Sequence, residues 1–81
     1  MEKAEIKEKV RDFIKNETAY SDDTITDESM IFNEGYLDSM GFVMLTTFIE
    51  EEFGIHIVDS DLVEENFESI NAITDFVVNK L

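Results

Sequence analysis

The sequence contains no cysteine, no proline and no tryptophan, and it has only three glycines. Without cysteine the chain forms neither a disulfide nor a thiolate metal site, so any thiol chemistry must come from a prosthetic group or a partner. The lack of proline and the scarcity of glycine favour helices over a turn-rich sheet. Seven phenylalanines and a 43% apolar fraction indicate a folded globule rather than an acidic disordered tail.

Long hydrophobic runs are missing as well. The longest wholly apolar stretch, residues 42–45, is far too short to span a membrane. Residues 1–5 are charged and no apolar segment follows them, so no signal peptide is predicted and we expect a cytoplasmic protein. We also expect one domain over residues 1–81, because a chain this short cannot build two hydrophobic cores.

Positive charge is absent from most of the chain. Five of the six basic residues lie within the first fifteen positions, and residues 16–79 contain sixteen carboxylates but no Lys or Arg, for a net charge of −14. Such a field repels nucleic acid and anionic membranes, and it attracts basic proteins or cations. Solubility alone would also explain the acidity, and the composition does not decide between these explanations.

The apolar spacing predicts four helices, over about residues 3–17, 39–53, 60–66 and 70–80, with a long connection over 18–38. The Glu and Lys residues of the first helix are expected to form an ordinary solvated face. The inward-facing residues are expected to be Ile6, Val10, Phe13, Ile14, Ile70, Ile73, Phe76, Val77 and Leu81. The long connection is expected to be pinned to the core by Ile25, Met30, Ile31, Phe32 and Leu37.

Helix ends are marked by residue type. Asp38 or Ser39 can cap the second helix by accepting hydrogen bonds from its free backbone N–H groups, and Ser69 can do the same for the last helix. Gly54 stands where a glycine commonly ends a helix in the left-handed conformation. Residues 55–58 are expected to form an extended connector.

The second helix carries two apolar stripes where one would suffice. One stripe, Phe42, Leu45, Ile49 and Phe53, has the spacing of a core-facing side. The other consists of Met40, Val43, Met44 and Thr47 and continues into Glu50 and Glu51. An apolar strip that ends in acids is typical of a docking surface, and methionine adapts its shape to several partners. The alternative is a central helix that is packed on two sides, as in many bundles.

Ser39 stands at the expected start of this helix. A phosphate ester on its hydroxyl would meet unpaired backbone N–H groups and the positive end of the helix dipole. Position alone does not separate this role from that of an ordinary capping serine, which Ser60 and Ser69 are expected to be.

The segment 35–40, Gly-Tyr-Leu-Asp-Ser-Met, precedes an amphipathic helix that ends in Glu-Glu-Glu-Phe-Gly-Ile over residues 50–55. Together these segments resemble the acyl carrier protein family, and the likeness covers nearly the whole chain. In that family an Asp-Ser-Leu motif carries phosphopantetheine on its serine; here Met40 replaces the leucine. The resemblance implies an all-α, four-helix acyl-carrier-protein-like bundle with three longer helices, one short helix and a long first loop. It also implies that Ser39 carries 4′-phosphopantetheine derived from coenzyme A, with Asp38 and Met40 at the attachment site.

The same resemblance implies a carrier rather than an enzyme, which holds an acyl or aminoacyl group as a thioester and presents it to partner enzymes. These partners would be a phosphopantetheinyl transferase, a loading ligase and a downstream transferase, met by a monomer that binds no nucleic acid and inserts in no membrane. The expected partner-binding residues are Val43, Met44, Thr47, Glu50 and Glu51. The pathway is left open among fatty acid, polyketide and nonribosomal peptide biosynthesis and cell-wall modification.

One departure bears on the subfamily. Fatty-acid carriers usually have acids two and five positions after the serine, where this chain has Gly41 and Met44. The first half of the docking face would therefore be apolar. In this respect, and in the spelling Gly-Tyr-Leu-Asp-Ser-Met, the chain is more similar to D-alanyl and peptidyl-type carriers.

Other candidate sites carry weaker signals. The sequence shows no pairing of a nucleophile with a base and no phosphate-binding glycine loop, and His56 is expected on the surface or in the connector. Residues 59–61 begin like a calcium loop but lack its spacing, so no metal site is predicted. The acids Asp22, Asp23, Asp27 and Glu28 are expected to be solvated. The rival function is an acidic adapter or nucleic-acid mimic without a prosthetic group, which would have no need of the Asp-Ser-Met motif.

Overall fold

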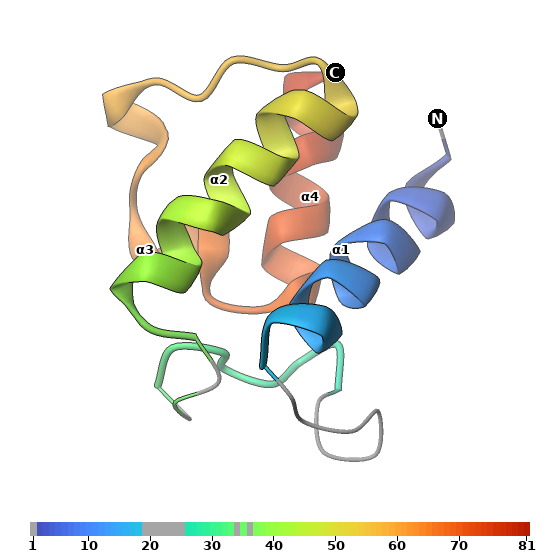
Figure 1. Cartoon of the computed structure of the whole chain (residues 1–81). Coiled ribbons are helices and arrows are strands. Elements are labelled where there is room, and N and C mark those ends of the chain that lie inside the picture. The colour runs from blue at the N-terminus through green and yellow to red at the C-terminus, as the bar shows by residue number, and fades with distance from the viewer. Residues whose placement is uncertain (1, 19–25, 34, 36) are drawn as a thin grey trace.

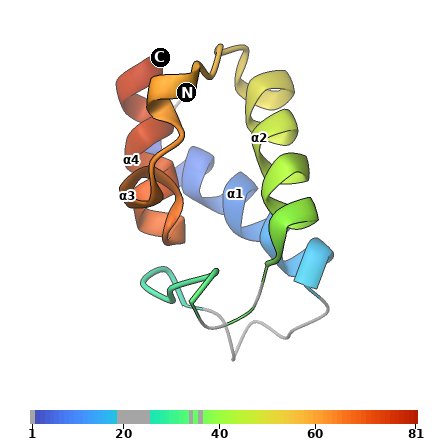
Figure 2. The same ribbon diagram turned by 90° about the vertical axis from the view of Figure 1, so that its left-hand side faces the viewer.

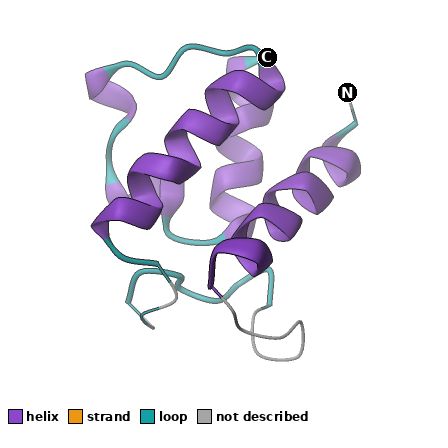
Figure 3. Ribbon diagram, in the orientation of Figure 1, coloured by secondary structure: helices purple, strands orange, loops and turns teal. Residues whose placement is uncertain are grey.

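A computed structural model describes residues 2–18, 26–33, 35 and 37–81, and all the regular structure in these ranges is helical (Figures 1 and 3). The elements are α1 (Lys3–Thr18), α2 (Ser39–Phe53), the 3-10 helix η1 (Asp59–Asp61), α3 (Glu64–Phe67) and α4 (Ile70–Lys80). The predicted all-α bundle with three longer helices is confirmed. No helix in the described ranges has both the length and the apolar character needed to cross a membrane.

The prediction of one helix over 60–66 is wrong, because two short helices separated by Leu62 and Val63 lie there. The first one ends at Asp61 because the backbone leaves the helical region at Leu62 (φ −82°, ψ 63°) and is extended at Val63 (φ −117°, ψ 149°). The Asp61 carboxylate stabilises the start of this single 3-10 turn. It accepts a hydrogen bond from the Val58 N–H at 3.1 Å and lies 2.6 Å from the Lys80 ammonium.

The helices surround one core. Figure 2 shows α2 on one side and α4 with α3 on the other, while α1 lies behind and between them. Contacts join α1 to α4, α3 to α4, and α1 to α2. The buried apolar residues are Ile6, Val10, Ile14, Ile31, Leu37, Leu45, Ile49, Phe53, Phe67, Ile70, Ile73, Phe76 and Val77.

Most of the predicted core residues are therefore confirmed, with one error and four partial cases. Leu81 was expected to point inward, but it follows the last residue of α4 and is 58% exposed. Phe13, Phe32 and Phe42 are half-buried and pack against the core from its edge, and Met30 is half-buried as well. Ile25 lies outside the described residues.

The described part of the long connection is ordered by backbone hydrogen bonds to other segments, as predicted. The Ile31 N–H donates to the Glu68 carbonyl at 3.0 Å, and the Leu37 N–H donates to the Ile31 carbonyl at 3.1 Å. The Asn71 N–H, in the first turn of α4, donates to the Asp27 carbonyl at 3.0 Å. The connection thus holds the start of α2 near the start of α4.

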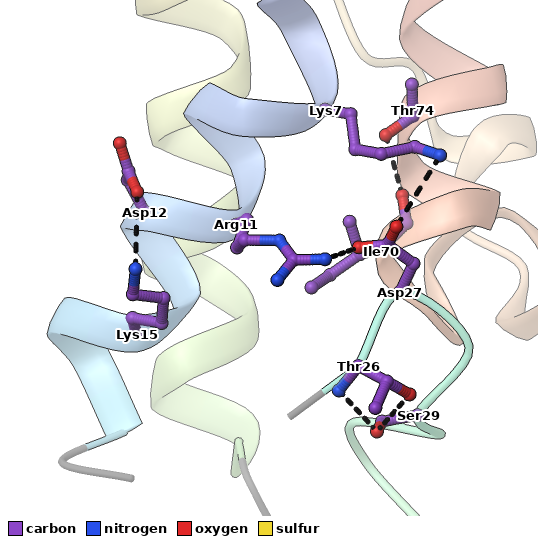
Figure 4. Close-up of polar contacts among 9 residues, drawn as sticks. All are labelled: Lys7, Arg11, Asp12, Lys15, Thr26, Asp27, Ser29, Ile70 and Thr74. Atoms are coloured by element: carbon purple, nitrogen blue, oxygen red, sulfur yellow. Dashed lines mark hydrogen bonds and ion pairs between the residues drawn. The ribbon is translucent and has the colours of Figure 1, made fainter. Parts of the chain in front are cut away.

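The basic residues of α1 do not form the ordinary solvated face that the sequence predicts. Four of them reach acids on other segments, and Figure 4 shows two of these contacts converging on Asp27. The pairs join Lys3 to Asp75, Lys7 and Arg11 to Asp27, and Lys9 to Glu52. The hydrogen bond from Lys9 to Glu52 raises the pKa of the Lys9 ammonium. Basic residues gathered in one helix therefore link it to acidic residues from the rest of the chain.

These pairs leave most of the negative charge uncompensated, since sixteen carboxylates lie between residues 16 and 79. We expect the melting temperature to rise with sodium chloride, because screening reduces repulsion among the carboxylates more than it weakens the few α1 pairs. Magnesium chloride should raise it more steeply per unit of ionic strength. Thermal unfolding followed by circular dichroism measures both slopes, and a flat or falling curve in both salts would contradict this account.

Candidate functional site

Asp38 caps the N-terminus of α2. Its backbone is extended, at φ −105° and ψ −169°, and its side chain accepts a hydrogen bond from the Gly41 N–H at 2.9 Å. Its carbonyl accepts from the Phe42 N–H, also at 2.9 Å. The sequence left the cap open between Asp38 and Ser39, and the structure assigns it to Asp38.

Ser39 is consequently free of a capping role. It is the first residue of a 15-residue helix, its side chain is exposed, and its hydroxyl has no hydrogen-bond partner among the described residues. Ser69 shows the opposite arrangement: it is buried, and its hydroxyl accepts a hydrogen bond from the Ala72 N–H at 3.1 Å. The Asp-Ser order thus leaves an available hydroxyl where backbone N–H groups and the helix dipole favour a phosphate.

Gly41 lies directly behind this serine and is buried against Leu37. A Cβ at position 41 would lie 2.9 Å from Leu37 Cδ2 and 3.3 Å from Leu37 Cβ. A side chain there requires Leu37 to shift. Gly41 therefore adds nothing to the exposed face of α2.

An apolar groove opens beside Ser39, between α2 on one side and the segment from Leu62 to Phe67 on the other. We call it the α2–α3 groove; its volume is about 560 Å³. Phe42 and Phe67, both in its lining, meet edge to face with ring centroids 5.3 Å apart. Leu62 and Val63 form its outer wall and are half exposed. Ser39 belongs to the lining, so a group attached to it has apolar surface within immediate reach.

The second stripe of α2 is exposed, so the alternative of a helix packed on two sides is wrong for this chain. Met40 is 68% exposed and Val43 is 55% exposed, and Met44, Thr47 and Glu51 are exposed beside them. The structure thus brings the predicted attachment residues and four of the five predicted partner-binding residues to one outward side of α2.

Glu50 differs from the other predicted partner-binding residues. It is half-buried, its carboxylate accepts a hydrogen bond from the Ile57 N–H at 3.0 Å, and His56 Nδ1 lies 3.5 Å away. Glu50 therefore ties the extended connector to the end of α2. His56 itself is exposed, as predicted.

We expect Glu50→Ala to lower the free energy of unfolding by about 1 kcal/mol, because the Ile57 N–H loses its acceptor. Glu51→Ala is the matched control and should stay within about 0.5 kcal/mol of the parent, since Glu51 is exposed and has no ion pair among the described residues. Urea unfolding of both variants measures the difference, and equal losses would show that the connector does not depend on this carboxylate.

The ion pair between Asp61 and Lys80 holds the segment that leads into the groove wall. The hydrogen bond from Lys80, and next the one from the Val58 N–H, lower the pKa of the Asp61 carboxyl below its usual value of 3.8. Because the folded-state pKa is the lower one, the associated stability is present above pH 3.8 and is lost as the pH falls through the folded-state pKa.

Asp61→Asn should therefore have a lower free energy of unfolding near neutral pH. That free energy should also fall less steeply than in the parent as the pH is lowered, a region that we call the acid limb. Urea unfolding at several pH values between about 2 and 7 measures that limb. Asp59→Asn, which removes a neighbouring exposed carboxylate, is the matched control. An unchanged acid limb in Asp61→Asn would mean that the pair contributes nothing.

Other acidic positions give no further site. Asp27 is engaged by Lys7 and Arg11, and Asp22 and Asp23 lie outside the described residues. Within the described ranges, no three His, Cys, Asp or Glu side chains are placed to hold a metal ion.

The α2–α3 groove was not predicted from the sequence, because Leu62 and Val63 were assigned to a helix. Two adjacent aliphatic residues without helical spacing were the signal that could have indicated it.

The sequence is similar to those of known proteins. The sequence profile of the phosphopantetheine attachment site matches residues 8–77. The chain is 34% identical over 80 residues to the acyl carrier protein of Chlorobium phaeobacteroides, covering 99% of this chain and 100% of the relative. It is also 34% identical over 80 residues to that of Chlorobium phaeovibrioides, with the same coverage. It is 28% identical over 81 residues to the acyl carrier protein of Thermosynechococcus vestitus, covering 100% of this chain and 98% of the relative.

Proposed function

The chain belongs to the acyl carrier protein family, and from that premise we propose that Ser39 is the residue that bears its 4′-phosphopantetheine arm. The protein is a carrier and not a catalyst, and partner enzymes act on what it holds. When bound, the arm supplies the thiol on which the cargo is held as a thioester. An adapter without a prosthetic group is not favoured, because the profile match spans the attachment motif.

The observation that carries the proposal is the exposed hydroxyl of Ser39 at the start of α2, which has no hydrogen-bond partner among the described residues. Asp38 satisfies the Gly41 N–H in its place, so esterification of Ser39 costs the helix no cap. Met40 is exposed on the outward side, and we propose that Asp38 and Met40 flank the arm where it leaves the protein. Residues 1–81 would act as a single carrier domain in the cytoplasm.

The exposed side of α2 is the surface that we assign to partner enzymes. We propose that a phosphopantetheinyl transferase, a loading ligase and a downstream transferase meet a monomer on the exposed side of α2. Val43, Met44 and Thr47 would provide the apolar contact, and Glu51 would meet basic residues of the enzyme. Glu50 would contribute less than the sequence suggests, because its carboxylate is already engaged by the connector.

The α2–α3 groove supports an acyl cargo with an apolar portion. Its walls are aromatic and aliphatic, with Phe42 and Phe67 in contact beside Ser39. An apolar chain gains from leaving water there, whereas a charged amino group would lose hydration without gaining a buried partner. Of the two kinds of cargo, we therefore propose an acyl group rather than an aminoacyl group.

Attachment is tested with the apo protein, coenzyme A and a broad-specificity phosphopantetheinyl transferase. Intact mass should increase by one arm, and peptide mapping should place it on the peptide that contains Ser39. The peptide with Ser60, another exposed serine, serves as the internal control, and omission of coenzyme A as the external one. An unchanged mass, or an arm on Ser60, would overturn the proposal.

A further inference from the structure

The methionines are the side chains of this chain that peroxides oxidise most readily. The sequence contains four methionines, no cysteine and no tryptophan, so the chain without its arm offers an oxidant neither a thiol nor an indole. Met1 lies outside the described residues, and Met30 is half-buried. Met40 and Met44, in contrast, are 68% and 45% exposed. Among the described methionines, an oxidant dissolved in water therefore reaches those of α2 first.

Met40 is the more accessible of these two and the closer to the attachment serine. It has the largest exposed fraction of all the large apolar side chains in the described ranges. It is the second residue of α2 and directly follows Ser39. Helical side chains lean toward the N-terminal end of their helix, which for Met40 is the end that begins with Ser39. Chemistry at its sulfur therefore takes place beside the serine hydroxyl.

The core does not depend on a methionine at this position, because Met40 is not among the buried residues. Leucine, which the Asp-Ser-Leu motif has here, is close to methionine in volume and is usually exchanged with it at little cost. Leucine has no sulfur, however, and peroxide does not oxidise it. Methionine therefore adds a reactive atom to this surface without a packing role that would account for it.

We propose that Met40 is a reversible oxidation site, at which hydrogen peroxide converts the thioether to a sulfoxide and thereby hinders enzymes from reaching Ser39. The inference rests on the proposed function, because it assumes that an enzyme attaches an arm to Ser39. It adds a modification of the carrier that controls this attachment.

The oxidation needs no reactant besides the peroxide. The sulfur donates an electron pair to one peroxide oxygen, the S–O bond forms as the O–O bond breaks, and the second oxygen leaves as water with both protons. The sulfur is oxidised by two electrons and the peroxide is reduced. A methionine sulfoxide reductase reverses the change with a dithiol. The sulfoxide oxygen then leaves as water while the two thiols form a disulfide.

The reaction changes the polarity of the exposed stripe of α2. Met40 begins this stripe, and Val43 and Met44 continue it three and four residues later, all of them exposed. A sulfoxide oxygen accepts hydrogen bonds from water, and covering it with an apolar enzyme surface costs free energy because those bonds are lost. The cap of α2 is unaffected, since Asp38 accepts from the Gly41 N–H at 2.9 Å. Oxidation should therefore impair recognition and leave the fold intact.

The test uses the full apo chain, which is the form that the transferase meets and which has no arm thiol to compete for the oxidant. The chain is treated with hydrogen peroxide until the intact mass shows the addition of one oxygen. Peptide mapping should find this oxygen on Met40 before Met44, and on Met30 last; the peptide with Met1 is read separately. The kcat/KM for loading of the treated chain should fall at least about fivefold, because an apolar contact has become polar.

Two variants with the same number of methionines locate the effect. Met40→Leu removes the proposed site, while Met44→Leu, the matched control, removes its neighbour on the same stripe. Each variant is compared with its own untreated form, because both positions belong to the surface assigned to enzymes. Peroxide should slow loading of Met44→Leu about as much as that of the parent, and should slow Met40→Leu less than about twofold. A methionine sulfoxide reductase with dithiothreitol should restore the parent, whereas dithiothreitol by itself should not.

Three results would overturn the inference. Oxidation of Met30 or Met44 ahead of Met40 would show that Met40 is not the preferred site. Equal slowing of Met40→Leu and Met44→Leu would place the effect on another residue. A loss of helical circular dichroism in the oxidised parent would mean that loading fails through unfolding. Failure of the proposed function looks different, because the untreated chain would then take up no arm at all.

Discussion

Ser39→Ala should abolish arm attachment: after incubation with coenzyme A and the transferase, the intact mass of this variant should stay that of the apo protein. In the proposed attachment, the serine oxygen bonds to the phosphorus of the pantetheine phosphate as the nucleotide part of coenzyme A leaves. Its hydroxyl proton goes to a base of the transferase. Alanine has no such oxygen, and among the described residues no other hydroxyl lies in the first turn of α2. The loss should therefore be complete rather than partial.

Two controls show whether the loss of the arm is due to the missing hydroxyl: the stability of the variant and the arm uptake of a second serine variant. Ser39→Ala should unfold within about 0.5 kcal/mol of the parent, because Asp38 and not Ser39 caps the helix. Asp38→Ala, in contrast, should cost about 1 kcal/mol as the loss of a cap. Ser60→Ala should take up one arm as the parent does. An arm on Ser39→Ala would place the attachment on another residue, and a variant too unstable to fold would show that the role of Ser39 is structural.

Phe67→Ala should reduce the free energy of unfolding by about 3–5 kcal/mol, a large part of the roughly 5–15 kcal/mol that holds a small domain together. Phe67 is only 2% exposed. Its ring lies 5.3 Å from that of Phe42 in α2 and 5.0 Å from that of Phe76 in α4. One side chain thus joins the short α3 to both long helices and leaves a cavity when it is removed.

Val63→Ala provides the control for Phe67→Ala, because Val63 lines the same groove but is 48% exposed. It should cost less than about 1 kcal/mol. Urea unfolding gives both values, and the slope of each transition reports whether the native state remains compact. A cost for Phe67→Ala as small as that of Val63→Ala would show that α3 contributes little to the core.

The long helices could be predicted because local and periodic signals agree in them. The observed bounds of α2 coincide with Asp38 as N-cap and with Gly54, which ends the helix at φ 67°. The residues between them follow a 3.6-residue period, and the core face of α4 was found in the same way. The proposal that Ser39 is the attachment serine comes from resemblance, since its position alone also fits a cap.

The features that sequence did not predict depend on contacts between distant segments. The α2–α3 groove exists because Leu62 and Val63 face Phe42 across the fold, and four-residue helices leave too short a period to detect. The role of Glu50 depends on the Ile57 N–H, seven residues along the chain. Likewise, local spacing suggested that Lys9 belongs to a solvated face of α1, whereas its partner Glu52 lies on another helix.

Because the basic residues are gathered in α1, the molecule also has an electric dipole moment. Negative charge that α1 does not balance is concentrated at the end of α2 and along η1 and α3, so the centres of positive and negative charge are displaced from one another. A basic enzyme surface exerts a torque on such a dipole while the two proteins are still separated by water. The acidic end of the molecule, formed by the end of α2 with η1 and α3, would therefore turn toward a basic surface before any side chains touch.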